Sequence, residues 1–307
     1  MYRIKDLATE QQIEYIKETF LQFLKKELRL YPVFAPLFVK TGTGINDDLN
    51  GIEKPVGFTT AKGKESYEIV QSLAKWKRMR LQELDVPLYE GIVTRMMAVR
   101  PDETLTPIHS VLVDQWDWEM VIQPSDRNMD FLKTVVSKIY HCLYSTEKKV
   151  SEQFRGPGSS LPNEITFISA KELYQQYPDK TPREREQIAA RKYGAIFISG
   201  IGDDLGNGEP HDGRAPDYDD WSLNGDIVLW HPVLGRSFEV SSMGIRVDAE
   251  TLKTQLAKMG MEHRKDLQFH QSLLTGKLPQ TIGGGIGQSR LAMFMLKKEH
   301  IGEVQYA

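Results

Sequence analysis

Residues 281–290, with the sequence TIGGGIGQSR, most constrain how this 307-residue chain can fold. Glycines let a backbone approach a ligand closely, and a helix that begins after them presents unpaired N–H groups to an anion. Arg290 adds a planar cation suited to phosphate. The stretch is not a Walker loop, since no Lys-Ser/Thr follows the glycines, and it lacks the third glycine of a dinucleotide fingerprint. By itself it fits a tight turn into a helix as well as a nucleotide site.

Composition predicts an ordinary globular protein. The net charge of −3 and the 26% of charged residues give no reason to expect nucleic-acid or membrane-surface binding. No apolar run is long enough to cross a membrane, and the opening MYRIKD lacks the apolar core of a signal peptide. The single cysteine, Cys142, excludes an intrachain disulfide and is typical of a reducing compartment. We therefore expect a cytoplasmic protein.

Apolar periodicity and turn signals predict both helices and strands. The predicted helices cover about residues 9–28 (from a Thr9/Gln12 capping box), 67–84, 126–154, 181–194, 249–259 and 265–274, with one more after the glycines. The predicted strands cover residues 91–100, 110–122, 164–169, 195–199, 225–233 and 237–242, with a proline-interrupted edge or interface strand at 31–39 and a loop at 200–221. Hairpin strands with long helices favour an α+β fold, and we expect residues 1–307 to form one domain.

The strand at residues 110–122 has an informative alternation. Period two places Gln115, Asp117 and Glu119 on one face. Trp116 and Trp118 fall on the other face with Asp114. The pattern suits a sheet whose polar face lines a cavity, and it is equally compatible with a polar outer face.

Two further sets of charges could carry chemistry. Arg100 begins an RPDE sequence at a strand end, which in isolation favours a solvated turn. Asp226 and Glu239 lie on the two strands of a predicted hairpin, where facing carboxylates repel each other. Mg²⁺ on a triphosphate would relieve that repulsion, because it prefers hard oxygen ligands. Opposed surface acids explain the pair equally well.

Two more polar stretches leave their roles open. The RAPDYDDW sequence at 214–221 misses the spacing of a calcium loop and fits a polar lid or a substrate contact better. On an ideal helix Ser72 and Lys75 share a face, whereas Lys77 falls about 180° away from Ser72. A charged helix face is the default interpretation of that cluster.

Together, Arg100 and its RPDE turn and residues 283–290 resemble motifs 2 and 3 of class II aminoacyl-tRNA synthetases. The prolines between residues 31 and 36, after a long helix, resemble the dimer-forming motif 1. Longer stretches are similar to the ammonia-dependent aspartate–ammonia ligase family, also called asparagine synthetase A: HSVLVDQWDWE at 109–119, SLAKWKR at 72–78, RAPDYDDW at 214–221 and SSMGIRV at 241–247. The resemblance covers about residues 13–305.

The resemblance implies a class II synthetase-like fold, with a central, mostly antiparallel sheet flanked by helices. It implies that aspartate, ATP and ammonia give asparagine, AMP and diphosphate through β-aspartyl-adenylate, in a homodimer that uses ATP and Mg²⁺. Glutamine-using asparagine synthetases begin with a catalytic cysteine, whereas residue 2 here is Tyr and Cys142 is predicted to lie mid-helix. Free ammonia, or ammonia from a separate partner, is therefore the expected nitrogen source.

The same resemblance assigns the site residues. Aspartate is expected at Asp47, Ser72, Lys77, Gln115, Asp117 and Ser242. ATP is expected at Arg100, Ile108, Asp226, Glu239, Gly283, Gly284, Gly285 and Arg290, with Mg²⁺ at Glu239 and Asp226. The expected catalytic residues are Arg100 against the α-phosphate, Asp219 at the incoming ammonium, and Asp47. The pairing of Lys77 with Ser72 requires a local distortion of the predicted helix.

Two alternatives stay open. The chain could be a stand-alone synthetase core that adenylates aspartate for another acceptor. It could also be a non-catalytic relative that binds an amino acid or tRNA. The balanced charge and the absence of an anticodon-type domain argue against tRNA. Retention of both arginines and both acids argues against a silent site, since such charges are costly to cluster without a ligand.

Overall fold

A central eight-stranded sheet organises this computed structural model, which describes residues 3–47, 49, 53–155 and 158–306. The strand order is β1-β5-β6-β11-β10-β9-β8-β7, and only the two outer pairs, β1/β5 and β7/β8, are parallel. The strands are β1 (Leu30–Pro32), β5 (Gly91–Val99), β6 (Leu112–Val121), β7 (Thr166–Ser169), β8 (Ala195–Ser199), β9 (Asp219–His231), β10 (Arg236–Arg246) and β11 (Thr281–Gly287). The expected α+β fold with a mostly antiparallel sheet is confirmed.

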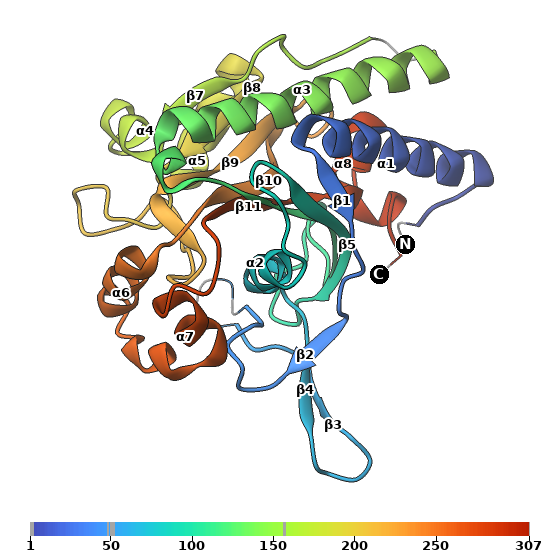
Figure 1. The fold of residues 1–307 in the computed structure, drawn as a ribbon. Helices are drawn as coiled ribbons and strands as arrows, with labels where there is room; N and C mark the ends of the chain where they lie inside the picture. Colours follow the sequence, from blue (N-terminus) through green and yellow to red (C-terminus); the bar gives the residue numbers. More distant parts are fainter. Residues whose placement is uncertain (1–2, 48, 50–52, 156–157, 307) are drawn as a thin grey trace.

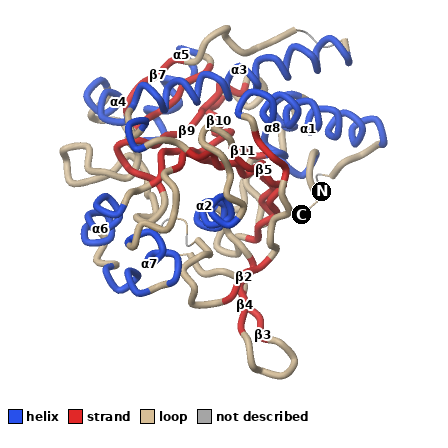
Figure 2. Tube along the Cα trace, in the orientation of Figure 1, coloured by secondary structure: helices blue, strands red, loops and turns tan. Residues whose placement is uncertain are grey.

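Helices cover both faces of this sheet (Figure 1). They are α1 (Leu7–Leu28), α2 (Ala74–Glu83), α3 (Met129–Phe154), α4 (Ala170–Gln176), α5 (Pro182–Tyr193), α6 (Ala249–Lys258), α7 (Gln268–Leu274) and α8 (Gln288–Met295). The long helices α1 and α3 lie side by side over one face, and α2 contacts β6 and β11 from the other (Figures 1 and 2). Among the described residues, no helix has the length and apolar character needed to cross a membrane.

The predicted alternation along residues 110–122 is confirmed. Trp116 and Trp118 are fully buried on the face of the sheet that packs against the long helices, and the ring of Phe20 in α1 lies 4.8 Å from that of Trp116. Gln115 and Asp117 line a cavity on the opposite face. Burial of the two indoles fixes which face of β6 is polar, because a shift by one residue would exchange the faces.

Several helix starts follow from their caps. Thr181 and Glu184 form the predicted capping box of α5. At α1 the predicted Thr9 capping box is wrong, because the helix begins at Leu7 and the N–H of Thr9 donates to the Asp6 carboxylate at 2.7 Å. The short helix α4 was not predicted, although Ser169 and Glu172 form its capping box.

The predicted helix at 67–84 is wrong in its first part. Residues Ser66–Ile69 form β4, which lies between β2 (Phe38–Lys40) and β3 (Gly57–Thr59) in a small separate sheet. Tyr67 packs there on Phe58 and Phe38, with ring centroids 5.6 and 5.3 Å away. These cross-strand contacts override the local helical periodicity.

The strands around the expected site are longer than predicted. β9 begins at Asp219, within the predicted loop, and β10 continues four residues beyond Ser242 to Arg246. The glycines belong to strand β11 rather than to a turn that opens a helix, and α8 begins only at Gln288. Pairing on both sides, with β6 and β10, keeps this glycine-rich segment extended.

Candidate active site

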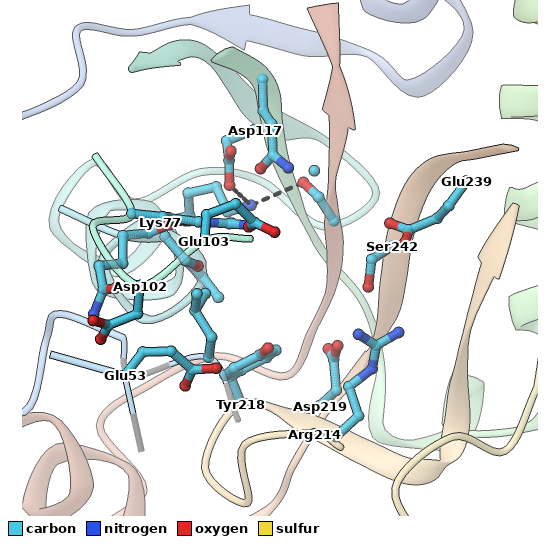
Figure 3. Close-up of a pocket in the computed structure, with 18 of the residues that line it drawn as sticks. Glu53, Lys77, Asp102, Glu103, Asp117, Arg214, Tyr218, Asp219, Glu239 and Ser242 are labelled. Carbon is cyan, nitrogen blue, oxygen red and sulfur yellow. Dashed lines mark hydrogen bonds and ion pairs between the residues drawn. The ribbon is translucent and has the colours of Figure 1, made fainter. Parts of the chain in front are cut away.

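A cavity of about 330 Å³ lies on the polar face of the sheet (Figure 3). Its walls come from β6, β10 and β11, from α2, and from the segments around Arg100 and Tyr218. A neighbouring cavity of about 220 Å³ shares Arg100, Gln115 and Glu239 with it. The two cavities together form one polar site large enough for two adjoining small ligands.

Lys77 and Asp117 face each other across the first cavity. Lys77 Nζ donates to Asp117 Oδ1 at 2.5 Å and to the Gly284 carbonyl at 2.9 Å. Both side chains are almost fully buried. This pair of opposite charges matches the two charges of an amino-acid zwitterion. The ammonium of such a ligand could pair with Asp117, and its carboxylate could pair with Lys77.

Ser72 and Lys77 both line this cavity, although they are 180° apart on an ideal helix. Helix α2 begins only at Ala74, whose N–H donates to Ser72 Oγ at 3.1 Å. Ser72 therefore precedes the helix, and its position is not set by helical periodicity. Lys75 points elsewhere, forming ion pairs with Asp217 at 3.1 Å and Asp47 at 3.7 Å.

Arg100 lies where the two cavities meet. Its Nε and one terminal nitrogen donate to the Gln71 carbonyl at 3.3 and 3.2 Å, which fixes the half-buried guanidinium. Because a carbonyl is neutral, these two hydrogen bonds do not neutralise the positive charge of Arg100. Such a cation suits an anionic phosphate group bound between the cavities.

Arg246, which lines the first cavity, pairs with two buried acids. Its guanidinium donates to Glu119 at 2.7 and 2.9 Å and to Asp219. Burial raises the pKa of the Asp219 carboxyl, with Arg246 opposing that shift. For Glu119 burial also acts to raise the pKa, but Arg246 and Thr281 outweigh it and the pKa is lowered.

Asp226 and Glu239 affect each other as two close acids do. Burial and the charge of Glu239 raise the pKa of Asp226 to about 7, against the opposing effect of Arg214. Asp226 pairs with Arg214, which lines the first cavity, and Glu239 lies 3.7 Å from Arg290. Figure 3 shows Glu239 and Arg214 on the same side of the cavity. A shared cation would lower the pKa of Asp226 and favour its charged form.

The glycines of β11 have different neighbours. A Cβ at Gly283 would collide with the Glu119 carboxylate and lie 2.7 Å from Arg246, whereas one at Gly285 would meet the amide of Gln115. Gly284 and Gly285 line the first cavity. Gly283 is therefore needed to accommodate a buried ion pair, which the sequence did not indicate.

This difference leads to a prediction for two alanine variants. Gly283→Ala should lower the free energy of unfolding by about 1–3 kcal/mol, because the Glu119 carboxylate is held in place and cannot yield. Gly285→Ala, the matched control, should cost less than about 1 kcal/mol, because the Gln115 amide is the mobile end of a side chain at a cavity. Urea unfolding of both variants measures the difference, and equal costs would contradict it.

The structure brings together most of the residues singled out from the sequence. The first cavity is lined by Ser72, Lys77, Arg100, Gln115, Asp117, Asp219, Glu239, Ser242, Gly284 and Gly285. The second is lined by Ile108 and Arg290 in addition. Asp47 borders a different cavity of about 400 Å³ with Lys75, Asp217 and His270.

Other residues of the first cavity were not singled out as site residues, among them Arg214, Tyr218 and Arg246. The first two belong to the RAPDYDDW sequence, for which a lid or substrate contact was expected. Arg246 lies two and four residues beyond Gly244 and Ser242, so strand alternation would have placed it on the same face. The predicted strand ended too early for that inference.

Cys142 is buried in α3, as predicted, and burial raises the pKa of its thiol to about 12. A thiol with that pKa is not a nucleophile near neutral pH. Within the described ranges, no cluster of three or more His, Cys, Asp or Glu side chains could hold a metal ion. Any cation at Asp226 and Glu239 would need ligand oxygens from a substrate as well.

Solved structures that share this fold are class II aminoacyl-tRNA synthetases. The asparaginyl-tRNA synthetase of Pyrococcus horikoshii, complexed with asparaginyl-adenylate, matches 97% of this chain and 68% of its own, with a TM-score of 0.69 and 17% identity. The Entamoeba histolytica asparaginyl-tRNA synthetase matches 97% of this chain and 67% of its own, with a TM-score of 0.67 and 14% identity. The fold is therefore class II synthetase-like.

Sequence comparison then defines the family. The model of the AsnA family, described as aspartate-ammonia ligase, matches residues 7–307. The aspartate–ammonia ligase of Malacoplasma penetrans is 52% identical over 306 residues, covering 99% of this chain and 94% of the relative. That of Fusobacterium nucleatum is 54% identical over 299 residues, covering 97% and 91%. The chain belongs to the aspartate–ammonia ligase family, and it is an enzyme of ATP-dependent asparagine synthesis.

Proposed function

We propose that the two adjoining cavities bind aspartate and ATP so that the β-carboxylate attacks the α-phosphorus, and that ammonia then displaces AMP from β-aspartyl-adenylate. Asparagine, AMP and diphosphate are the products. The position of Arg100 at the junction of the cavities carries this proposal, because the reacting carboxylate and phosphate are both anionic. A fixed cation there offsets their repulsion and stabilises the charge of the transition state.

Aspartate occupies the 330 Å³ cavity in this proposal. Asp117 and Gln115 receive its ammonium group, and Lys77 receives a carboxylate. Ser72 and Ser242 border the same cavity and donate hydroxyl groups. Asp47 acts from the neighbouring cavity, where it lies close to Lys75. The Lys77–Asp117 pair holds the empty site together and opens when the zwitterion binds.

ATP occupies the 220 Å³ cavity, with its α-phosphate at Arg100. Ile108 and Arg290 border this cavity and contact the adenosine in this proposal, and Gly284 and Gly285 let the β11 backbone approach the nucleotide. Arg290 is fixed by donation to the Glu239 carbonyl at 3.1 Å. Gly283 contributes indirectly, by leaving room for the Glu119–Arg246 pair.

Mg²⁺ fits beside the triphosphate at Glu239 and Asp226. Burial, together with the charge of Glu239, raises the pKa of Asp226 to about 7, and a divalent cation would stabilise the charged forms of both acids. When bound, Mg²⁺ neutralises phosphate charge and orients the leaving group. Asp226 and Glu239 then act as oxygen ligands, and Arg214 stays on the wall of the aspartate cavity.

Asp219 receives the incoming ammonium. Ammonium must lose a proton before its nitrogen can attack, and burial raises the pKa of Asp219 above that of an ordinary carboxyl. Arg246 fixes the orientation of this carboxylate. Asp219 therefore positions the ammonium and takes its proton as attack begins.

The deciding assay supplies ATP, Mg²⁺ and aspartate, with ammonium or glutamine added separately. Asparagine and AMP should form with ammonium and not with glutamine. Aspartate-dependent ATP–diphosphate exchange without asparagine would instead identify a core that adenylates aspartate for another acceptor. Failure of both reactions would identify a non-catalytic relative and overturn the proposal.

We also propose that the chain forms a homodimer through the region around β1. This edge strand of the large sheet carries the exposed side chain of Tyr31 and is followed by those of Phe34 and Leu37, with Phe34 99% exposed. Leu84 and Leu88, which precede β5 in the sequence, are also exposed and apolar. Exposed apolar residues beside an open strand edge favour association with a second copy. A cytoplasmic location and a single domain over residues 1–307 stay predictions.

Phe34→Asp tests the dimer. A carboxylate at the centre of a buried contact should shift the protein to monomer at micromolar concentration, because an unpaired charge would be desolvated. Sedimentation velocity measures the change. Met259→Asp, which changes an exposed apolar residue just beyond α6, should leave the assembly intact. Monomeric wild type, or dimeric Phe34→Asp, would contradict the proposed interface.

A further inference from the structure

Beside the nucleotide cavity lies a third cavity, of about 410 Å³, to which no role has been assigned above. It shares Ile108, His109, Glu239 and Arg290 with the nucleotide cavity, so the two are continuous. Its other walls come from the start of α5 and the start of β10. A ligand group that extends from the nucleotide site past Arg290 would enter it.

Three arginines border this cavity: Arg183 in the first turn of α5, Arg236 at the start of β10, and Arg290 in α8. The pKa of Arg236 is lowered by burial and by the charges of Arg183 and Arg290. The pKa of His109 is lowered to about 4 by burial and by the same three arginines, Arg290 most of all. Both effects agree with the three arginines bordering the same cavity.

Arg183 and Arg236 form no ion pair with a carboxylate of the described residues, and only the charge of Glu186 opposes the lowered pKa of Arg236. Arg236 Nε donates a hydrogen bond to the Ser237 carbonyl at 3.3 Å, which leaves its charge unpaired within the described ranges. The acids of the cavity are engaged elsewhere. Glu186 accepts a hydrogen bond from His211 Nε2 at 3.0 Å, Asp212 accepts the Gly213 N–H, and Glu239 lies beside Arg290.

One buried nitrogen in the same wall has no hydrogen-bond partner among the described residues. His211 is 3% exposed, and its Nδ1 forms no hydrogen bond with the described residues. Buried polar atoms are nearly always satisfied, so this nitrogen indicates a missing ligand or water. Clustered cations without counterions indicate in turn that the ligand is an anion.

We propose that the cavity bordered by Arg183, Arg236 and Arg290 binds the diphosphate group that ATP releases. This inference rests on the proposed function. When the β-carboxylate oxygen bonds to the α-phosphorus, the bond from that phosphorus to the bridging oxygen breaks, and diphosphate leaves with the electron pair. A fork of guanidinium groups beyond Arg290 receives that charge, favours cleavage and holds the product away from the adenylate.

The test measures binding of magnesium diphosphate to the full chain by calorimetry, with AMP as a second ligand. The double variant Arg183→Gln/Arg236→Gln should bind diphosphate at least about tenfold more weakly, because charge-assisted hydrogen bonds are lost. Its affinity for AMP should stay within about twofold. If ATP affinity falls in parallel, the cavity holds the β- and γ-phosphates before reaction; if it does not, the cavity holds the free product.

Arg80→Gln/Arg191→Gln removes the same charge from positions outside the cavity and should bind diphosphate like the wild type. The single variant Arg183→Gln changes an exposed side chain and should not disturb the fold, so it keeps the test valid if the double variant folds poorly. Undiminished diphosphate binding in both Arg183 variants, or equal weakening in the control, overturns the inference. Diphosphate binding is measured without turnover. A failure of the asparagine-synthesis assay would therefore count against the proposed function and not against this binding site.

Discussion

Arg100→Ala should lower the rate of aspartate-dependent ATP–diphosphate exchange by about 10²–10³-fold, the effect of removing a preorganised charge from a transition state. Arg100 is the cation at the junction of the two cavities, and its contacts to the Gln71 carbonyl fix its direction before substrate binds. The exchange assay isolates adenylate formation from the later attack by ammonia. Arg100→Lys should recover little activity, because an ammonium lacks the planar fork.

The fold of Arg100→Ala should stay intact, since the side chain is half-buried and its hydrogen bonds to the described residues go to a single carbonyl, that of Gln71. Thermal unfolding and circular dichroism check this. Arg80→Ala is the matched control: it removes an exposed arginine of α2 that pairs with Glu83 at 2.9 Å. Its exchange activity should be normal. Near-normal exchange in Arg100→Ala would remove the observation that carries the proposed function.

Arg246→Met should lower the free energy of unfolding by about 3–5 kcal/mol, the cost of breaking a buried ion pair by removing one partner. Glu119 is fully buried and forms its ion pair with Arg246, which also pairs with Asp219. Without the guanidinium, both acids would have to be protonated or to draw in water. Urea unfolding near neutral pH measures the loss, which should shrink at low pH as the acids take up protons.

A double variant keeps this prediction open to test even if Arg246→Met folds poorly. Glu119→Leu/Arg246→Met replaces the pair with apolar side chains, and it should be more stable than Arg246→Met alone. The difference between the single and double variants measures the coupling of the two residues. A cost below about 1 kcal/mol for Arg246→Met would show that water already compensates these charges.

Much of the fold was predictable because its signals are local. The alternation of Gln115 with Trp116, the capping box at Thr181 and the apolar stripe around Cys142 each depend on residues one to four positions apart. The predictions failed where a distant strand decided the outcome. Tyr67 lies in a strand because Phe38 and Phe58 pack on it, and Asp219 lies in a strand because β10 pairs with it.

The chain by itself determined its family, the polar face of β6 and the charged residues expected to bind substrates in the two cavities, since these depend on residue identity and on short periodicities. Only the tertiary structure decided that Arg246 holds Glu119 and Asp219, that Gly283 makes room for that pair, and that Asp47 borders a separate cavity. Arg246 and Glu119 are 127 residues apart in sequence. Contacts of that range are set by the register of the strands between them, which only the folded sheet fixes.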